Sequence, residues 1–164
     1  MAEFTKAEPQ KEHQWLQKLV GAWTWEHDTP PGPDEPAKKH QGTETVRSLD
    51  GIWIVAEGYG EMPDIGPTTT ITTLGFDPEK KRFVGTFIGS MMTSLWIYEG
   101  QLDTARNALV LDTEGPSFTD PSKRAKYTDT IHFENDDYRI LTSAYQGDDG
   151  QWNEFMKAHY RRKR

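Results

Sequence analysis

The chain has 164 residues, no cysteine, 34% hydrophobic residues, 12% aromatic residues and a formal net charge of −7. A chain of this length fits one domain and can fold without a disulfide or a metal. The absence of cysteine excludes thiol catalysis, iron–sulfur clusters and cysteine zinc sites, and the negative charge argues against nucleic acid as the main partner.

Charged side chains run through residues 1–14, which lack the apolar core that a signal peptide requires. No stretch of the chain approaches the roughly 20 apolar residues of a membrane span. We therefore expect a cytoplasmic protein that binds neither a membrane nor nucleic acid. Residues 1–10 are expected to be disordered or extended, residues 11–162 to form a single domain, and the basic residues 161–164 to be solvated.

Residues 11–20 show the spacing of one amphipathic helix. Trp15, Leu16, Leu19 and Val20 share a face, and the charged and amide side chains fall elsewhere. Gly21 is a natural stop for this helix. Because the first strand follows at once, the helix is expected to plug the closed base of the domain.

Beyond residue 21, apolar and β-branched stretches alternate with Gly, Pro and Asp clusters, which is typical of an antiparallel all-β domain. About ten strands are predicted, near residues 22–28, 42–48, 52–59, 68–75, 82–89, 93–101, 107–113, 124–134, 138–146 and 151–161. Such a count favours a closed barrel over an open sheet. No second helical segment is predicted to make parallel crossovers, so we expect an up-and-down antiparallel meander.

The links between these strands predict which end of the barrel is functional. Successive links of a meander lie at alternate ends, and function on β scaffolds tends to lie on the longer loops. The mouth is therefore expected at the end that carries residues 28–41, 60–67, 89–92, 114–122 and 147–150. A pocket is expected to open near residues 28–41 and 60–67.

Period-2 alternation sorts the side chains between the two faces of each strand. If Trp23 points inward, so do Trp25 and His27, and the polar Thr24 and Glu26 point outward.

The same alternation makes Phe83 and Phe87 internal, and it favours Trp96 and Tyr98 on the inside of the next strand. The last strand groups Trp152, Glu154, Met156, Ala158 and Tyr160 on one face, against Phe155, Lys157, His159 and Arg161 on the other.

The strand near residues 52–59 is apolar on both faces, so its orientation stays open. If Trp53 is internal, so are Glu57 and Tyr59, and Glu57 would then be a buried carboxylate that needs a partner.

Gly21-Ala-Trp23, after a short helix and before an up-and-down barrel, resembles the lipocalin or calycin pattern. Three further segments resemble a bacterial family of uncharacterised calycin-like proteins, domain of unknown function 1579. They are Leu49-Asp-Gly-Ile-Trp53, Leu74-Gly-Phe-Asp77 followed by Arg82-Phe-Val84, and Tyr98-Glu-Gly-Gln-Leu-Asp103. The likeness covers about residues 12–162. It implies a barrel with a ligand-sized interior and supplies no catalytic residues.

The aromatic wall assembled in this way suits a small hydrophobic or amphipathic ligand held by a few polar groups. The predicted ligand-binding residues are Trp23, Trp25, His27, Glu57, Tyr59, Phe87, Met91, Trp96 and Tyr98. The five histidines show no zinc-ligand spacing, and we predict no metal site, no cofactor and no catalytic residue.

Several alternatives stay open at this point. One is an enzyme of the isomerase or hydratase type that uses Glu57 with His27 in the same cavity. Another is an interaction module whose barrel is filled by side chains. A third is haem binding through the late His159. A homodimer that forms through an exposed sheet face is also compatible with the sequence.

Overall fold

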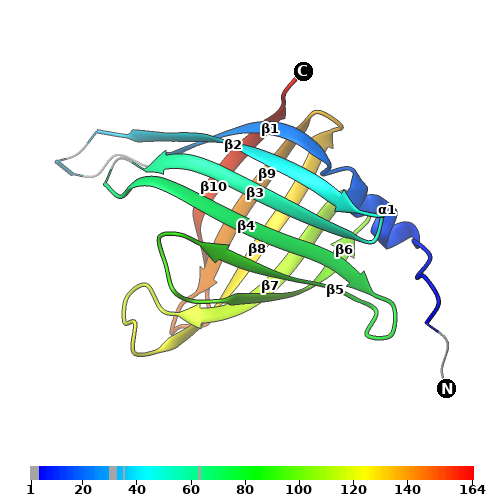
Figure 1. The fold of residues 1–164 in the computed structure, drawn as a ribbon. Coiled ribbons are helices and arrows are strands. Elements are labelled where there is room, and N and C mark those ends of the chain that lie inside the picture. The colour runs from blue at the N-terminus through cyan, green and yellow to red at the C-terminus, as the bar shows by residue number, and fades with distance from the viewer. Residues whose placement is uncertain (1–3, 30–32, 35, 63) are drawn as a thin grey trace.

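Ten antiparallel strands form a closed barrel in the computed structural model, which describes residues 4–29, 33–34, 36–62 and 64–164 (Figure 1). One short helix lies at one end of this barrel in the described part of the chain. The predicted all-β class, the ten strands and the N-terminal helix are confirmed. The first three residues lie outside the described part, and residues 4–10 are exposed and form no helix or strand.

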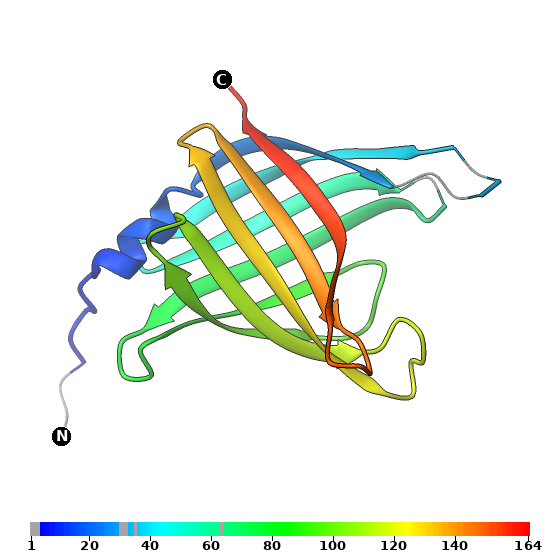
Figure 2. The same cartoon turned by 180° about the vertical axis from the view of Figure 1, so that it is seen from behind.

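The strands follow one another around the barrel in chain order, and the first strand pairs with the last. Their bounds are β1 (Gly21–Thr29), β2 (Lys38–Leu49), β3 (Trp53–Met62), β4 (Gly66–Asp77), β5 (Arg82–Gly89), β6 (Trp96–Asp103), β7 (Ala108–Pro116), β8 (Arg124–Asn135), β9 (Tyr138–Gln146) and β10 (Trp152–Arg162). Trp25 of β1 lies opposite Tyr160 of β10 at the closing seam. Figure 2 shows β8, β9 and β10 side by side on the other face of the barrel.

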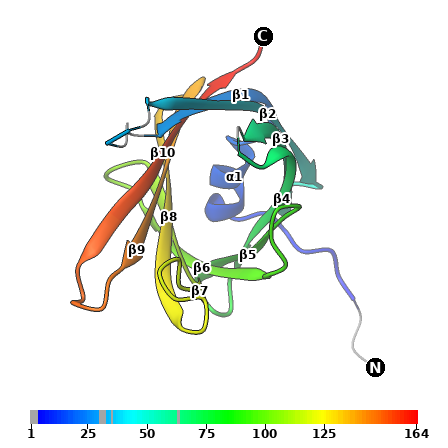
Figure 3. The same ribbon diagram turned by 90° about the vertical axis from the view of Figure 1, so that its left-hand side faces the viewer.

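Helix α1 (Lys11–Gln17) closes one end of the barrel. It is shorter than the predicted 11–20, because the chain turns after Gln17 to enter β1. Leu16 and Leu19 are buried in the core. The view into the barrel in Figure 3 shows α1 across its far end, as expected for a plug.

His13 fastens this helix to the barrel. Its ring Nδ1 accepts the N–H of Gln10 at 2.9 Å, and Nε2 lies 3.0 Å from the carbonyl oxygen of Phe76 on β4. Since the carbonyl can only accept, Nε2 carries the proton in this arrangement. The buried ring therefore has both nitrogens satisfied by backbone groups.

Trp23 forms the floor of the barrel above the helix. Its ring is fully buried, and its indole N–H donates to the carbonyl of Leu19 at 2.8 Å. The guanidinium groups of Arg139 and Arg162 lie over the ring, with Cζ at 4.6 Å and 4.3 Å from the ring centroid. The floor is thus held by packing, one hydrogen bond and two cation–π contacts.

The inward positions predicted by alternation are confirmed for several aromatic residues. Trp23, Phe83, Trp96 and Tyr98 are all buried in the barrel. Trp25 also lies on the inner wall, where a Cβ added at Gly42 or Gly60 would come within 2.5 Å of its indole. The two glycines therefore let a large ring lie flat against β2 and β3.

The inward placement considered for Glu57 and Tyr59 of β3 is wrong. Both side chains are on the outer surface, and Tyr59 is 50% exposed. The inner face of this strand carries the buried Ile54 and Ala56 instead. The glycine at position 60 shares that inner face and leaves the space that Trp25 occupies.

The predicted inward and outward faces of the last strand are wrong for Trp152 and Phe155, because β10 contains a β-bulge. Glu154 pairs with Ala144 and Met156 with Ser143, so Phe155 is an extra residue in β10. Phe155 therefore reaches the inner side together with Met156. Trp152, which alternation grouped with Met156, is instead 48% exposed on the outside.

Among the helices of the described residues, none has the length and hydropathy needed to cross a membrane.

Candidate ligand cavity

A cavity of about 300 Å³ lies inside the barrel between the helix-capped floor and the mouth. This volume is at the lower end of the roughly 300–1,000 Å³ found for ligand pockets. Aliphatic side chains from neighbouring strands form its lower part, among them Val46, Ile54, Leu74 and Leu111. The interior is therefore not completely filled by side chains, in contrast to the filled-barrel alternative.

Aromatic rings form much of the remaining wall. Phe87 of β5 and its cross-strand partner Trp96 of β6 line the cavity, and so does Tyr160 of β10. Trp96 packs edge-on against Tyr127 of β8 with ring centroids 5.2 Å apart. Its indole N–H lies 2.9 Å from the sulfur of Met92. These contacts fix the Trp96 ring beside the β5–β6 link, whose Met91 and Met92 also line the cavity.

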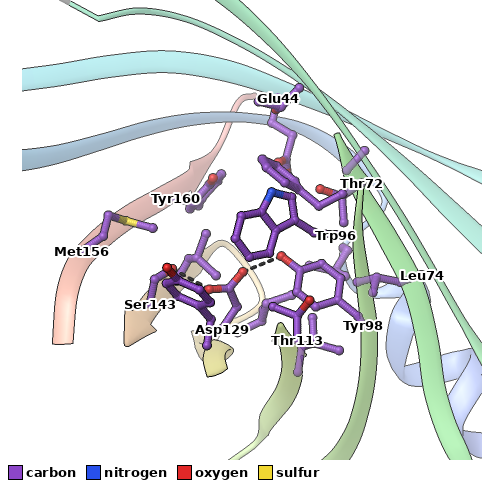
Figure 4. A pocket seen from close by; sticks show the side chains of 18 of the residues that line it. Glu44, Thr72, Leu74, Trp96, Tyr98, Thr113, Asp129, Ser143, Met156 and Tyr160 are labelled. Carbon is purple, nitrogen blue, oxygen red and sulfur yellow. Dashed lines mark hydrogen bonds between the residues drawn. The ribbon is translucent and has the colours of Figure 1, made fainter. Parts of the chain in front are cut away.

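Asp129 of β8 forms the polar centre of the cavity (Figure 4). The hydroxyl of Ser143 donates to its Oδ1 at 2.6 Å, and the hydroxyl of Tyr98 donates to its Oδ2 at 2.5 Å. Ser143 comes from β9, which pairs with β8, and Tyr98 comes from β6, which is separated from β8 by β7 alone. Three strands thus converge on one carboxylate.

Burial dominates the electrostatics of this centre. Loss of hydration raises the pKa of Asp129 above its usual range, although the two hydroxyl donors act in the opposite direction. Burial, and then the adjacent Asp129 carboxylate, raise the pKa of Tyr98 well above its ordinary value. Tyr98 therefore stays protonated and acts as a donor near neutral pH.

Glu44 and Arg139 form a second polar group, nearer the floor. Arg139 is 3% exposed, and its Nη2 donates to Oε1 of Glu44. The guanidinium also lies over the Tyr160 ring at 4.0 Å. Its Nε has no hydrogen-bond partner among the described residues. The arginine charge is thus compensated by one carboxylate and by aromatic faces.

The mouth of the cavity is lined by flexible and aromatic side chains. Met91 and Met92 come from the β5–β6 link, Phe118 from the β7–β8 link, and Phe155 from the bulge of β10. The rings of Phe118 and Phe155 meet edge-on with centroids 5.2 Å apart. Methionine side chains adapt readily to different apolar shapes, so this rim can change its shape more easily than the aromatic wall.

One sequence family matches almost the whole chain. The family described as "Protein of unknown function (DUF1579)" matches residues 8–162. The chain belongs to this family. No curated protein matches the chain.

Solved structures share the barrel at low sequence identity. Rv2717c from M. tuberculosis is similar with a TM-score of 0.59 and 10% identity, and the match covers 96% of this chain and 100% of that one. The S-type phycobiliprotein lyase CPES from Guillardia theta is similar with a TM-score of 0.55 and 13% identity over 93% of both chains. The DUF1579 chain therefore has the calycin-like fold, and at this level of identity the likeness concerns the fold alone.

Of the predicted ligand-binding residues, the structure brings some together around the cavity and leaves others outside it. Those that line the cavity are Phe87, Met91, Trp96 and Tyr98. Trp23 lies beneath the cavity in the floor. Trp25 is held against the wall, where its indole N–H lies 3.3 Å from the carbonyl of Thr43.

His27 does not line the cavity. Its ring stacks on His40 of β2 at 4.5 Å and on Trp25 at 5.9 Å. Burial, and then the neighbouring His40, lower the pKa of His27. Because Glu57 lies on the outer face of the barrel, the structure does not form the Glu57–His27 pair considered for an enzyme.

His159 is also absent from the cavity lining. It lies opposite Glu26 at the seam, and its Nδ1 is 2.6 Å from the hydroxyl of Tyr138. The structure thus gives this histidine no access to an interior haem. Within the described ranges, no three His, Cys, Asp or Glu side chains form a group that could hold a metal ion.

The cavity opens at the predicted end of the barrel, beside residues 89–92 and 114–122, but not near residues 28–41 and 60–67. None of the described residues of 28–41 and 60–67 lines the cavity, and residues 30–32, 35 and 63 lie outside the described part. Trp25 occupies the interior beside β2 and β3, so the cavity reaches the mouth on the side of Met91 and Phe118.

Sequence reasoning missed Asp129, Ser143 and the Glu44–Arg139 pair. A signal existed for Asp129, because it shares its inward face with Tyr127, Ile131 and Phe133. A single carboxylate on an apolar face is an unusual observation that points to the interior.

Proposed function

We propose that this chain binds a small, largely apolar molecule with at least one polar group inside the barrel. The observation that carries the proposal is the cavity of about 300 Å³, with its aromatic wall, its polar centre at Asp129 and the Glu44–Arg139 pair that also lines it. Apolar pockets with a few convergent polar groups are the usual form of small-molecule sites. The apolar wall supplies most of the affinity, and the polar centre orients the ligand. We place this binding in the cytoplasm, since a chain without cysteine suits a reducing compartment.

The fluorescent dye N-phenyl-1-naphthylamine tests this proposal, because it is apolar and its emission rises when it leaves water. We expect saturable binding to the purified protein. Thr72 of β4 lines the cavity, so Thr72→Phe is expected to fill it and to weaken dye binding at least tenfold.

Thr45→Phe is the matched control, since Thr45 is exposed on the outside of β2 and the same ring is added there. It should bind the dye like the wild type. Equal dye binding by the wild type and Thr72→Phe, with both proteins folded by circular dichroism, would contradict binding inside the barrel.

A further inference from the structure

The geometry points to a ligand that is an organic cation, an apolar molecule whose protonated amine pairs with the carboxylate of Asp129. This inference rests on the proposed function and names the chemical class that the same cavity selects. It follows from the hydrogen bonds, the charges and the ring faces around Asp129.

The carboxylate of Asp129 has acceptor capacity left on the cavity side. Each of its oxygens accepts one hydroxyl, from Ser143 and from Tyr98. A carboxylate offers about four acceptor sites in total. Asp129 lines the cavity, so an ammonium group of a bound ligand can donate to its remaining acceptor sites (Figure 4).

The charge of Asp129 also lacks a counterion. Among the ion pairs of the described residues, none includes Asp129. An ionised carboxylate away from water is costly without an opposite charge nearby. The raised pKa of Asp129 reflects this cost. A cationic ligand would supply the missing charge at the place where it is needed.

Aromatic residues around the same cavity favour a cation as well. Trp96, Tyr98 and Tyr160 all line it. The face of an aromatic ring attracts a cation, and the attraction is strongest where water is excluded. Arg139 shows this directly, because its guanidinium already lies 4.0 Å from the centroid of the Tyr160 ring. An apolar amine can use the same kind of contact near Asp129.

Charge balance argues against an anionic ligand. The interior contains the two carboxylates of Glu44 and Asp129 and the single guanidinium of Arg139, which is already paired with Glu44. An added carboxylate would place three negative groups against one positive group in a region of low polarity. An added ammonium instead gives two positive groups, the ammonium and Arg139, against the two carboxylates.

Three probes of one shape test this selectivity, and they are 2-phenylethylamine, 2-phenylethanol and 3-phenylpropanoate. Each is titrated at about pH 7.5, where the amine is protonated, by displacement of the naphthylamine dye and by calorimetry. We expect the amine to bind at least tenfold more tightly than the alcohol, and the carboxylate to bind most weakly. Asp129→Asn is expected to remove this preference and to change alcohol binding less than threefold.

Asp112→Asn is the matched control, because Asp112 is exposed on the outside of the neighbouring strand β7. It should keep the wild-type order of the three probes. An alcohol that binds as tightly as the amine, or an Asp129→Asn protein that keeps the preference, would overturn the inference. Preference for the carboxylate would overturn it too, and would point to Arg139.

The outcome separates this inference from the proposed function. If the dye binds and the amine does not bind even at millimolar concentration, the cationic ligand is wrong and the binding function stands. If the dye fails to bind as well, the proposed function is contradicted. The order of the probes on the wild-type protein decides the question even where Asp129→Asn fails to fold.

Discussion

Asp129 occupies an inward position of β8 that an apolar residue could have filled. Tyr127 and Ile131 flank it on the same face, and both are buried. Its carboxylate has exchanged much of its water for the hydroxyls of Ser143 and Tyr98. Since burial outweighs these donors, the pKa is raised and the group titrates closer to neutral pH than a surface aspartate does.

The raised pKa of Asp129 predicts that binding of an amine depends on pH. Binding of 2-phenylethylamine should weaken as the pH falls from about 8 through the raised pKa of Asp129, because only the ionised carboxylate pairs with an ammonium. The charged and titratable groups around Asp129 are Tyr98, Tyr160 and the Glu44–Arg139 pair. Burial raises the pKa of both tyrosines, so they stay neutral over this range.

Calorimetric titrations at several pH values measure this effect. The alcohol probe serves as the control, and its affinity should not follow the titration of Asp129. In Asp129→Asn the affinity for the amine should also become independent of pH. A wild-type protein whose affinity for the amine stays constant as the pH is lowered to the point where the protein unfolds would argue against Asp129 as its partner.

Single residues also show where sequence reasoning succeeds. The interior assignment of Trp96 and Tyr98 is confirmed, although the opposite face of their strand carries the apolar Leu95 and Ile97, which are both exposed. Arg139 could not be assigned, because Arg139, Leu141 and Ser143 alternate with Tyr138, Ile140 and Thr142, and neither face is distinctly apolar. Its partner Glu44 comes from a strand that is distant in the chain, so the pair depends on barrel closure.

At the scale of elements, the bulge in β10 shapes the mouth. One extra residue at Phe155 changes which side chains face inward, and it places that ring against Phe118. Phe155 also lies near Tyr127 and Tyr145, with ring centroids 6.3 Å and 6.0 Å away. This small aromatic cluster covers part of the entrance to the cavity.

Because this aromatic cluster covers part of the entrance, removal of the Phe155 ring is expected to change the rates at which a ligand enters and leaves the cavity. Phe155→Ala should speed both entry and release of the naphthylamine dye several-fold, while the dissociation constant changes less than either rate. The physical reason is that the ring obstructs the path more than it contacts a ligand at Asp129. Stopped-flow fluorescence measures both rates.

Trp152→Ala provides the comparison, since Trp152 lies on the same strand but on the outside of the barrel. Its rates should equal those of the wild type. If Trp152→Ala accelerated exchange as much as Phe155→Ala, the rates would reflect general loosening of β10 and not an open mouth.

The strands themselves were predictable from alternation and turn residues, and the bulge was not. Two polar residues, Asn153 and Glu154, followed by two apolar ones, Phe155 and Met156, break the alternation here, but they do not show which residue is the extra one. The orientation of β3 was also undetermined, because both of its faces carry apolar residues. It is fixed by Trp25, whose ring needs the inward glycines at positions 42 and 60.

At the scale of the whole molecule, Arg162 ties the helix, the first strand and the β8–β9 turn together. Its Nη1 donates to the carbonyl of Val20 at 2.8 Å, and its Nη2 donates to that of Lys18 at 2.9 Å. Its Nε lies 3.2 Å from the carbonyl of Asp136. This arginine belongs to the segment expected to be solvated, and it is instead a structural part of the closed end.

Loss of the Arg162 hydrogen bonds is expected to make the folded protein less stable. Arg162→Met keeps much of the apolar stem and removes the charged donors, so it should lower the free energy of unfolding by about 2–4 kcal/mol. The melting temperature should fall by roughly 5–15 °C for a chain of this size. Thermal and urea unfolding measure both quantities.

The neighbouring Arg161→Met is the control. Arg161 is half exposed and pairs with Glu26 on the outer surface. An exposed ion pair of this kind contributes about 1 kcal/mol or less, so this variant should remain close to the wild type. Equal losses for the two variants would show that the position in the chain, and not the contacts of Arg162, accounts for the effect.

The seam between β1 and β10 has a consequence for how the protein is made. The other strand pairs of the described barrel join neighbours in the chain and can form as successive hairpins, whereas the seam joins residues 23–26 to residues 159–162. The strand that closes the barrel also supplies Phe155, Met156 and Tyr160 to the cavity. On the ribosome, the cavity therefore forms only after the last strand has emerged.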